Sequence, residues 1–180
     1  MSLVVGTGAG EAAAESPNSV AEIDTYFANR GNVQWAGTAA EKEAYARQGS
    51  DWLEGVYGLR LSGDRQVAGQ ALSFPRIDAE YLDGRTIAIS TVVKEWKFAH
   101  CEASLLAKLG TLSKVYKRGG RIKRVAVEGA IEEEFFDDAP ATPLFEDVEK
   151  HLAMLVLPLR PRMKFSKPSP PDLIGYRQYR

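Results

Sequence analysis

The residue types that most often carry protein chemistry are sparse in this 180-residue sequence. It has one cysteine, Cys101, and two histidines, His100 and His151. All three lie in helical patterns, and the histidines lack a metal-ligand spacing such as His-x-x-x-His. We interpret them as packed or helix-surface residues, and a single cysteine can form no disulfide within the chain. No Ser/His/Asp or Cys/His arrangement can be assembled, so we expect a protein that is not an enzyme and that uses no metal and no cofactor.

Clustered carboxylates offer a weak hint of a divalent-ion site. Glu132, Glu133 and Glu134 are consecutive, and Asp137 and Asp138 follow closely. Successive residues of a strand point to opposite faces, so these side chains would not converge on one ion. We interpret the cluster as a solvated acidic edge that discourages wrong strand pairing.

A run of basic residues without an acid is more informative. Such a cluster suits phosphate contacts that carry no sequence information, and a solvated helix end favoured by the helix dipole is the alternative. The chain as a whole has a net charge of −1, so any nucleic-acid contact must be local. The stretch 128–149 that follows is acidic, and it could meet the basic residues of a neighbouring subunit or pair within the chain. The basic run consists of Lys114, Lys117, Arg118, Arg121, Lys123 and Arg124.

Both ends of the chain have compositions that are poor at folding alone. Residues 1–18 are rich in Gly, Ala and Ser, and we expect an arm that orders only against a partner. Residues 158–180 combine prolines and basic residues with spaced aromatic side chains, which is typical of an extended segment that lies on another surface. Its candidate anchors are Arg160, Arg162, Phe165, Tyr176, Arg177 and Tyr179.

Between these arms, residues 19–157 have the pattern of one helical domain. Ser19 with Glu22 predicts a capping box for a helix over 20–29 that ends in a left-handed cap around 30–32. Thr38 is the expected N-cap of a second helix that reaches Tyr57. A structured loop over 58–88, with a helical turn near 67–72, precedes a long helix over 90–116. A hairpin over 121–136 and a last helix over 144–157 complete the domain.

The long helix is apolar on two sides and must therefore be covered on two sides. It is either the central helix of a bundle or a helix with one stripe against a neighbouring subunit. One stripe contains Val92, Trp96, Ala99, Ala103, Leu106 and Gly110, and the other contains Phe98, Cys101, Leu105, Leu109 and Leu112. The predicted fold class is mainly α, a small helical bundle with a short β-hairpin and extended N- and C-terminal arms.

Several stretches resemble a family of small tailed-phage proteins. They run from Asn18 to Gly31 with Trp35, from Glu41 to Arg47 and from Asp51 to Glu54. The segment Gln70-Ala-Leu-Ser-Phe-Pro-Arg76, the most specific part, and Asp83-Gly84 continue the resemblance. Such proteins are described as DnaT-like single-stranded-DNA-binding proteins, and their structural relatives are head-to-tail connector, or head-completion, proteins. The resemblance spans about residues 16–157. Gln48-Gly49 departs from it, because relatives keep better helix formers there.

The resemblance implies a structural virion protein at the head-tail junction, assembled in the host cytoplasm. Its partners would be other copies of itself in a ring of about twelve subunits, the portal protein, the next tail or connector protein, and packaged DNA through non-specific contacts. We see no membrane segment in the sequence. The alternative, a single-stranded-DNA-binding protein, needs exposed aromatic side chains for base stacking. Trp35, Trp52 and Trp96 lie in patterns that look buried, and only Tyr116 beside the basic run favours that alternative.

Overall fold

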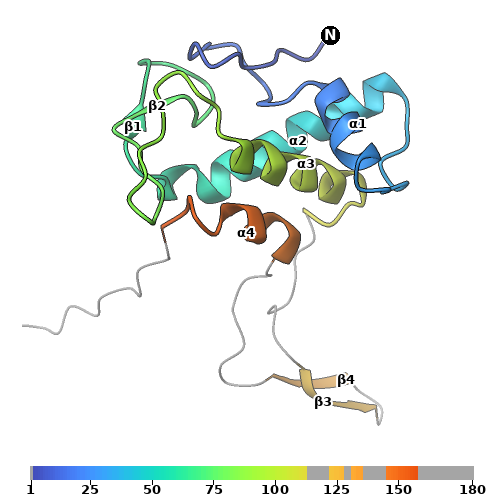
Figure 1. Ribbon diagram of the computed structural model, residues 1–180. Coiled ribbons are helices and arrows are strands. Elements are labelled where there is room, and N and C mark those ends of the chain that lie inside the picture. Colours follow the sequence, from blue (N-terminus) through green and yellow to red (C-terminus); the bar gives the residue numbers. More distant parts are fainter. Residues whose placement is uncertain (1, 113–121, 128–130, 136–144, 158–180) are drawn as a thin grey trace, which may run out of the picture.

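The computed structural model describes residues 2–112, 122–127, 131–135 and 145–157. Within this part of the chain, four α-helices form the bulk of the fold, with a short 3-10 helix and two antiparallel two-stranded sheets. Figure 1 shows α3 running through the middle of the helical body, where it packs against both α2 and α4. The predicted fold class, mainly α with a short hairpin, is confirmed.

The first two helices begin where their capping residues predict. Helix α1, Val20–Ala28, starts after Ser19, whose hydroxyl accepts the backbone N–H of Glu22 while the Glu22 carboxylate accepts that of Ser19. Helix α2, Ala39–Tyr57, starts after Thr38 with the same reciprocal arrangement to Glu41. Each box satisfies N–H groups that the first helical turn leaves without partners.

The predicted left-handed cap of α1 is also present. Gly31 has φ of 64° and donates to the Ala28 carbonyl at 3.1 Å, and Asn32 donates to Phe27 at 3.1 Å. These two bonds form a Schellman motif, which closes the carbonyl end of the helix.

The long helix is shorter than the sequence predicts. Helix α3 spans Lys94–Lys108, not 90–116. At its start Ser90 has a positive φ of 61°, which the right-handed helix does not allow. At its end Gly110 has φ of 67°, and Thr111 donates to the Leu106 carbonyl at 3.0 Å, a second Schellman cap. The prediction that the helix continues is therefore wrong for residues 109–112. Residues 113–116 lie outside the described part.

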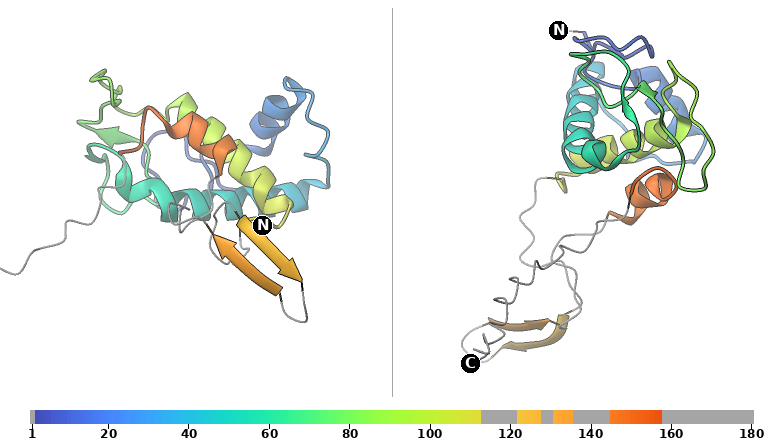
Figure 2. Two further views of the ribbon diagram at one scale, coloured as in Figure 1. Left: turned by 90° about the horizontal axis from the view of Figure 1, so that it is seen from below. Right: turned by 90° about the vertical axis from the view of Figure 1, so that its left-hand side faces the viewer.

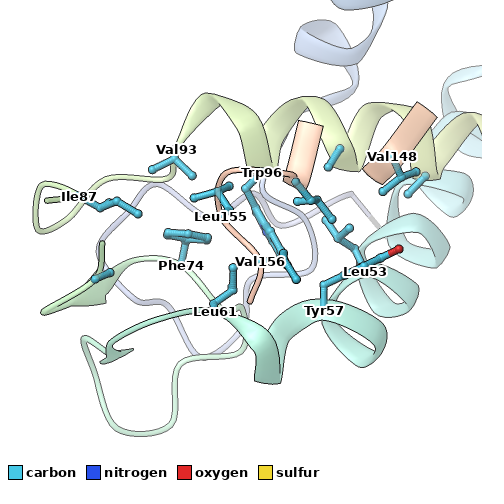
Figure 3. Packing of buried hydrophobic residues seen from close by; sticks show 14 residues of the cluster. Leu53, Tyr57, Leu61, Phe74, Ile87, Val93, Trp96, Val148, Leu155 and Val156 are labelled. Carbon is cyan, nitrogen blue, oxygen red and sulfur yellow. The ribbon is translucent and has the colours of Figure 1, made fainter. Parts of the chain in front are cut away.

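Both apolar sides of α3 are covered by the protein's own chain. One side, with Trp96, Ala99 and Ala103, belongs to a core cluster that extends over α2, α4 and the 61–93 loop, shown in Figure 3. The other side, with Cys101 and Leu105, packs in a second cluster against α1 and the start of α2. The structure thus favours the central-bundle interpretation over a stripe that faces a neighbouring subunit.

The last helix, α4, spans Glu146–Leu152 and is shorter than the expected 144–157. Beyond it the chain turns, and Leu155 and Val156 still enter the main core. Backbone bonds hold this segment to the loop after α2, because Leu157 donates to the Arg60 carbonyl at 2.9 Å. The apolar pattern of the sequence extends beyond α4 because Leu155 and Val156 are buried although they are not helical.

The predicted structured loop over 58–88 is present and extends to residue 93, with η1 at Gly58–Arg60, β1 at Asp64–Arg65 and β2 at Arg76–Ile77. The expected helical turn near 67–72 is not formed, and turns and bends replace it. Figure 2 shows this loop gathered at one end of the helical body.

The N-terminal segment differs most from expectation. Ser16 and Asn18 are buried, and Gly6 donates to the Ser16 carbonyl at 2.8 Å. Ala71 of the loop donates to the Glu11 carbonyl at 3.2 Å. Residues 2–18 therefore order against their own domain rather than only against a partner. Backbone hydrogen bonds and small buried side chains hold this segment in place. Its Gly- and Ala-rich composition therefore shows no hydrophobic pattern from which the packing could be predicted.

Candidate assembly and nucleic-acid surface

The predicted hairpin is confirmed as a pair of antiparallel strands, β3 at Ile122–Val127 and β4 at Ile131–Phe135. In the register, Arg124 lies opposite Glu134 and Val125 opposite Glu133, with an irregularity between Ile122 and Arg124. A strand with two basic residues is thus paired with a strand with three acidic ones. Neither strand packs on any other described element.

The predicted basic surface lies only partly within the described residues. Lys123 and Arg124 are on β3. The remaining members of the run, and all the predicted anchors of the C-terminal arm, lie outside the described residues: Lys114, Lys117, Arg118, Arg121, Arg160, Arg162, Phe165, Tyr176, Arg177 and Tyr179. Tyr116 lies outside them as well.

The tryptophans of the described chain do not form an open stacking surface. Trp96 has no exposed surface, and Trp35 is 6% exposed. Trp52 is half-buried and meets the rings of Tyr57 and Phe145 edge-on, with centroids 5.6 and 4.9 Å away. Among the described residues no aromatic side chain is among the large exposed apolar ones. Base stacking needs a free aromatic face, so these residues serve the core.

A groove between α1 and α3 combines aromatic and cationic groups around a cavity of about 420 Å³. The Arg30 guanidinium lies 3.5 Å from the ring centre of Tyr26 and 5.0 Å from that of Phe98. Lys97 lines the same groove and is paired with Glu22 at 2.8 Å. This groove is not among the sites that the sequence predicts. Its only signal was Arg30 one helical turn after Tyr26.

His100 is a structural residue, as predicted. Its Nε2–H donates to the Ala46 carbonyl at 2.9 Å, and its Nδ1 accepts from the Asn18 amide at 3.0 Å. Burial lowers the pKa of His100 to about 4, so the ring is neutral at physiological pH. It ties the N-terminal segment, α2 and α3 together and faces no open cavity.

The other two candidate reactive groups, Cys101 and His151, are also held in packed positions. Burial raises the pKa of the Cys101 thiol to about 12, which leaves it protonated and a poor nucleophile. His151 lies 3.0 Å from the Tyr26 hydroxyl, and burial lowers its pKa. In the part of the chain that the structure describes, no three His, Cys, Asp or Glu residues gather as a metal site.

The segment 70–76, the most specific part of the resemblance, builds the interior of the loop. The Gln70 amide donates to the carbonyls of Leu72 at 2.8 Å and Pro75 at 3.0 Å, and its oxygen accepts the backbone N–H of Val67 at 2.9 Å. Gln70 is 4% exposed. Its three bonds therefore fix the backbone rather than offering a binding group.

Arg76 has a matching role at the end of this segment. Arg76 is 7% exposed, and its guanidinium donates to backbone carbonyls around it. A planar group with five N–H donors can satisfy several acceptors at once, which a lysine cannot. The carbonyls that accept its N–H groups belong to Leu61, Ser62, Gly63 and Ser73.

The fold and the hairpin together define a small, mainly helical protein whose charged hairpin stands apart from its core. Residues 1–167 match the family described as "Putative DnaT-like ssDNA binding protein", and the chain belongs to that family. The match extends at both ends beyond the stretch 16–157 that carries the resemblance in the sequence. No curated protein and no solved structure matches the chain. No described helix has the length and apolar character needed to cross a membrane.

Proposed function

We propose that this chain is a structural subunit of a tailed-phage virion, a head-to-tail connector that assembles with further copies into a ring beneath the portal and around the DNA channel. The observation that carries the proposal is the hairpin β3–β4, which packs on no other described element. A two-stranded hairpin alone is at best marginally stable in water. A neighbouring subunit would supply the surface that the described helical body does not.

The distribution of aromatic and reactive groups supports a structural role. The tryptophans pack in or against the core, and the histidines and the cysteine are held in packed positions. We therefore propose a protein that is not an enzyme. Its contacts would be made by backbone edges and charged side chains.

The charge of the chain suits a channel that DNA slides through. With a net charge of −1, the chain as a whole does not attract a polyanion, so contacts with DNA would be confined to local basic groups. The basic run, of which Lys123 and Arg124 lie on β3, would meet phosphates without reading sequence. The C-terminal arm, from Pro158 on, would dock on the portal through its arginines and tyrosines.

The test is the mass of the full-length protein alone and with a portal protein, followed by imaging of the complex. We expect a ring on the portal. Protein that neither oligomerises nor associates with portal would overturn the proposal.

A second candidate is binding of single-stranded DNA, which the family description supports directly. The structural observation in its favour is the groove between α1 and α3, where Arg30 lies over the Tyr26 ring beside Phe98. A nucleic-acid base could enter the groove only by displacing the Arg30 guanidinium or by stacking on it. Stacking is possible because a guanidinium packs favourably against an aromatic face. Lys97, although paired with Glu22, would then be close enough to contact a phosphate of the bound strand.

The two candidates are separated by affinity for a short single strand across a salt series. Single-strand binding predicts tight association by a monomer and a loss of about 1–3 kcal/mol per stacked base on Phe98→Ala. Thr25→Ala, in the same groove, is the matched control because its side chain offers no ring. The connector proposal predicts weak, salt-sensitive binding that neither substitution changes.

A further inference from the structure

Within the described part of the chain, each strand of the hairpin has one edge without a strand partner, and the two edges differ in charge. The sheet contains β3 and β4 alone among the described residues. β3 carries Lys123 and Arg124 and no acid, whereas β4 carries Glu132, Glu133 and Glu134 and no base. The free N–H and C=O groups of an open edge are a template for pairing with another strand.

We propose that the outer edge of β4 in one copy pairs with the outer edge of β3 in the next copy, so that one sheet runs through the assembly. The inference rests on the proposed assembly and adds the surface that forms it. Within each hairpin Arg124 already lies opposite Glu134. Pairing β4 with a neighbour's β3 repeats the same alternation of basic and acidic strands across the boundary between copies.

The charges also disfavour the simplest alternative. A two-fold dimer joined at this sheet would place β3 beside β3, or β4 beside β4. Both pairings set like charges on adjacent strands, which destabilises a sheet. Head-to-tail pairing avoids this repulsion in every copy.

Head-to-tail pairing has a consequence for the form of the assembly. Because each copy offers a different edge to its two neighbours, association continues until it closes into a ring or runs on as a filament. It also joins each hairpin to further strands, and three or more strands are more stable than two. The hairpin that lacks a partner within the described chain thus gains one on either side.

A charge-exchanged full-length chain tests the pairing. The substitutions Lys123→Glu, Arg124→Glu, Glu133→Lys and Glu134→Lys leave the net charge at −1 and keep residue 124 opposite an unlike charge at residue 134. We expect the exchanged chain to assemble with itself to the wild-type mass. When labelled exchanged and wild-type chains are mixed, we expect particles containing both to be about tenfold rarer than random mixing gives, because like-charged edges repel.

Half-exchanged chains provide the complementary measurement. Lys123→Glu with Arg124→Glu alone should lose assembly, and so should Glu133→Lys with Glu134→Lys alone, because each pair of changes sets like charges opposite each other both between copies and within the hairpin, at residues 124 and 134. Circular dichroism controls for retention of the helices. Random mixing of exchanged with wild-type chains, or an exchanged chain that no longer assembles, would overturn the pairing while leaving the connector proposal in place. A wild-type chain that is monomeric alone and with portal would instead contradict the connector proposal itself.

Discussion

Gly49 shows how a single residue sets the distance between two helices. It lies within α2 and faces α3, and a Cβ atom there would be 2.7 Å from the backbone nitrogen of Ser104 and 2.8 Å from its Oγ. Real Cβ atoms do not approach backbone that closely. The departure from helix formers at Gln48-Gly49 therefore has a packing cause that sequence alone does not reveal.

We expect Gly49→Ala to destabilise the fold by about 1–3 kcal/mol, the usual cost of overpacking a core. Gly55→Ala is the matched control, because it lies in the same helix and a Cβ there meets nothing within 4 Å. That control should stabilise the helix by up to about 1 kcal/mol, since alanine is the better helix former. Denaturant unfolding measures both, and an equal response of the two variants would refute the close approach.

His100 makes the stability of the protein depend on pH. Its pKa in the fold is about 4, below the ordinary 6.5, because burial disfavours the charged ring. Between these pH values the unfolded chain takes up a proton that the folded chain does not. Stability is therefore full above about pH 6.5 and falls as the pH approaches 4. His151, whose pKa is also lowered, acts in the same direction.

We expect His100→Gln to flatten this pH dependence, because glutamine does not titrate and its amide can still donate to the Ala46 carbonyl. Unfolding free energies measured from pH 7 to pH 4 should then fall less steeply than in the wild type. His151→Gln controls for the second histidine. A variant as acid-sensitive as the wild type would show that His100 is not the group responsible.

At the scale of elements, local chemistry predicted more than periodicity did. The capping boxes at Ser19 and Thr38 and the cap at Gly31 placed the ends of α1 and α2 to within a residue, because these signals act on the backbone directly. The ends of α3 and α4 were overestimated, since burial of Leu155 continues an apolar pattern where the backbone is no longer helical. The groove at Arg30 could not be predicted, because it depends on how α1 crosses α3.

The loop after α2 shows why the segment 70–76 is specific without being a binding motif. Gln70 and Arg76 are buried and bonded to backbone carbonyls and N–H groups of the same loop. A backbone that needs this many side-chain bonds tolerates few residue types. The loop therefore provides one end of the core, against Trp96 and Leu155.

We expect Arg76→Lys to destabilise the fold by about 1–3 kcal/mol, because a lysine leaves several buried carbonyls without a donor. Arg65→Lys is the control, since the Arg65 side chain is half exposed and its ion pair with Glu54 is 3.8 Å long. Thermal unfolding should separate the two variants clearly. If Arg76→Lys unfolds at the same temperature as the wild type, the bonds from the Arg76 guanidinium to the four carbonyls do not stabilise the loop.

At the scale of the whole molecule, the helical body is complete in itself. Both sides of α3 are covered within the chain, and no buried polar side-chain atom of the described residues lacks a hydrogen-bond partner. Assembly contacts are therefore not needed to finish the core. In the proposed assembly they would fall to the hairpin and to the arm from residue 158 on.

This division predicts that a chain ending at Leu157 keeps its fold. Leu157 still bonds to Arg60 in both directions, and no described element lies beyond it. We expect an unchanged unfolding midpoint and an unchanged self-assembly mass, together with loss of portal binding. A truncated chain that still binds portal with full affinity would place the portal contact elsewhere.

The most direct test of the central claim is the mass of the full-length protein in solution over a concentration series, measured with and without a short single strand of DNA. The connector account predicts a discrete oligomer many times the monomer mass, unchanged by the DNA. A monomer at every concentration that binds the single strand tightly would contradict the account and establish the single-strand-binding alternative.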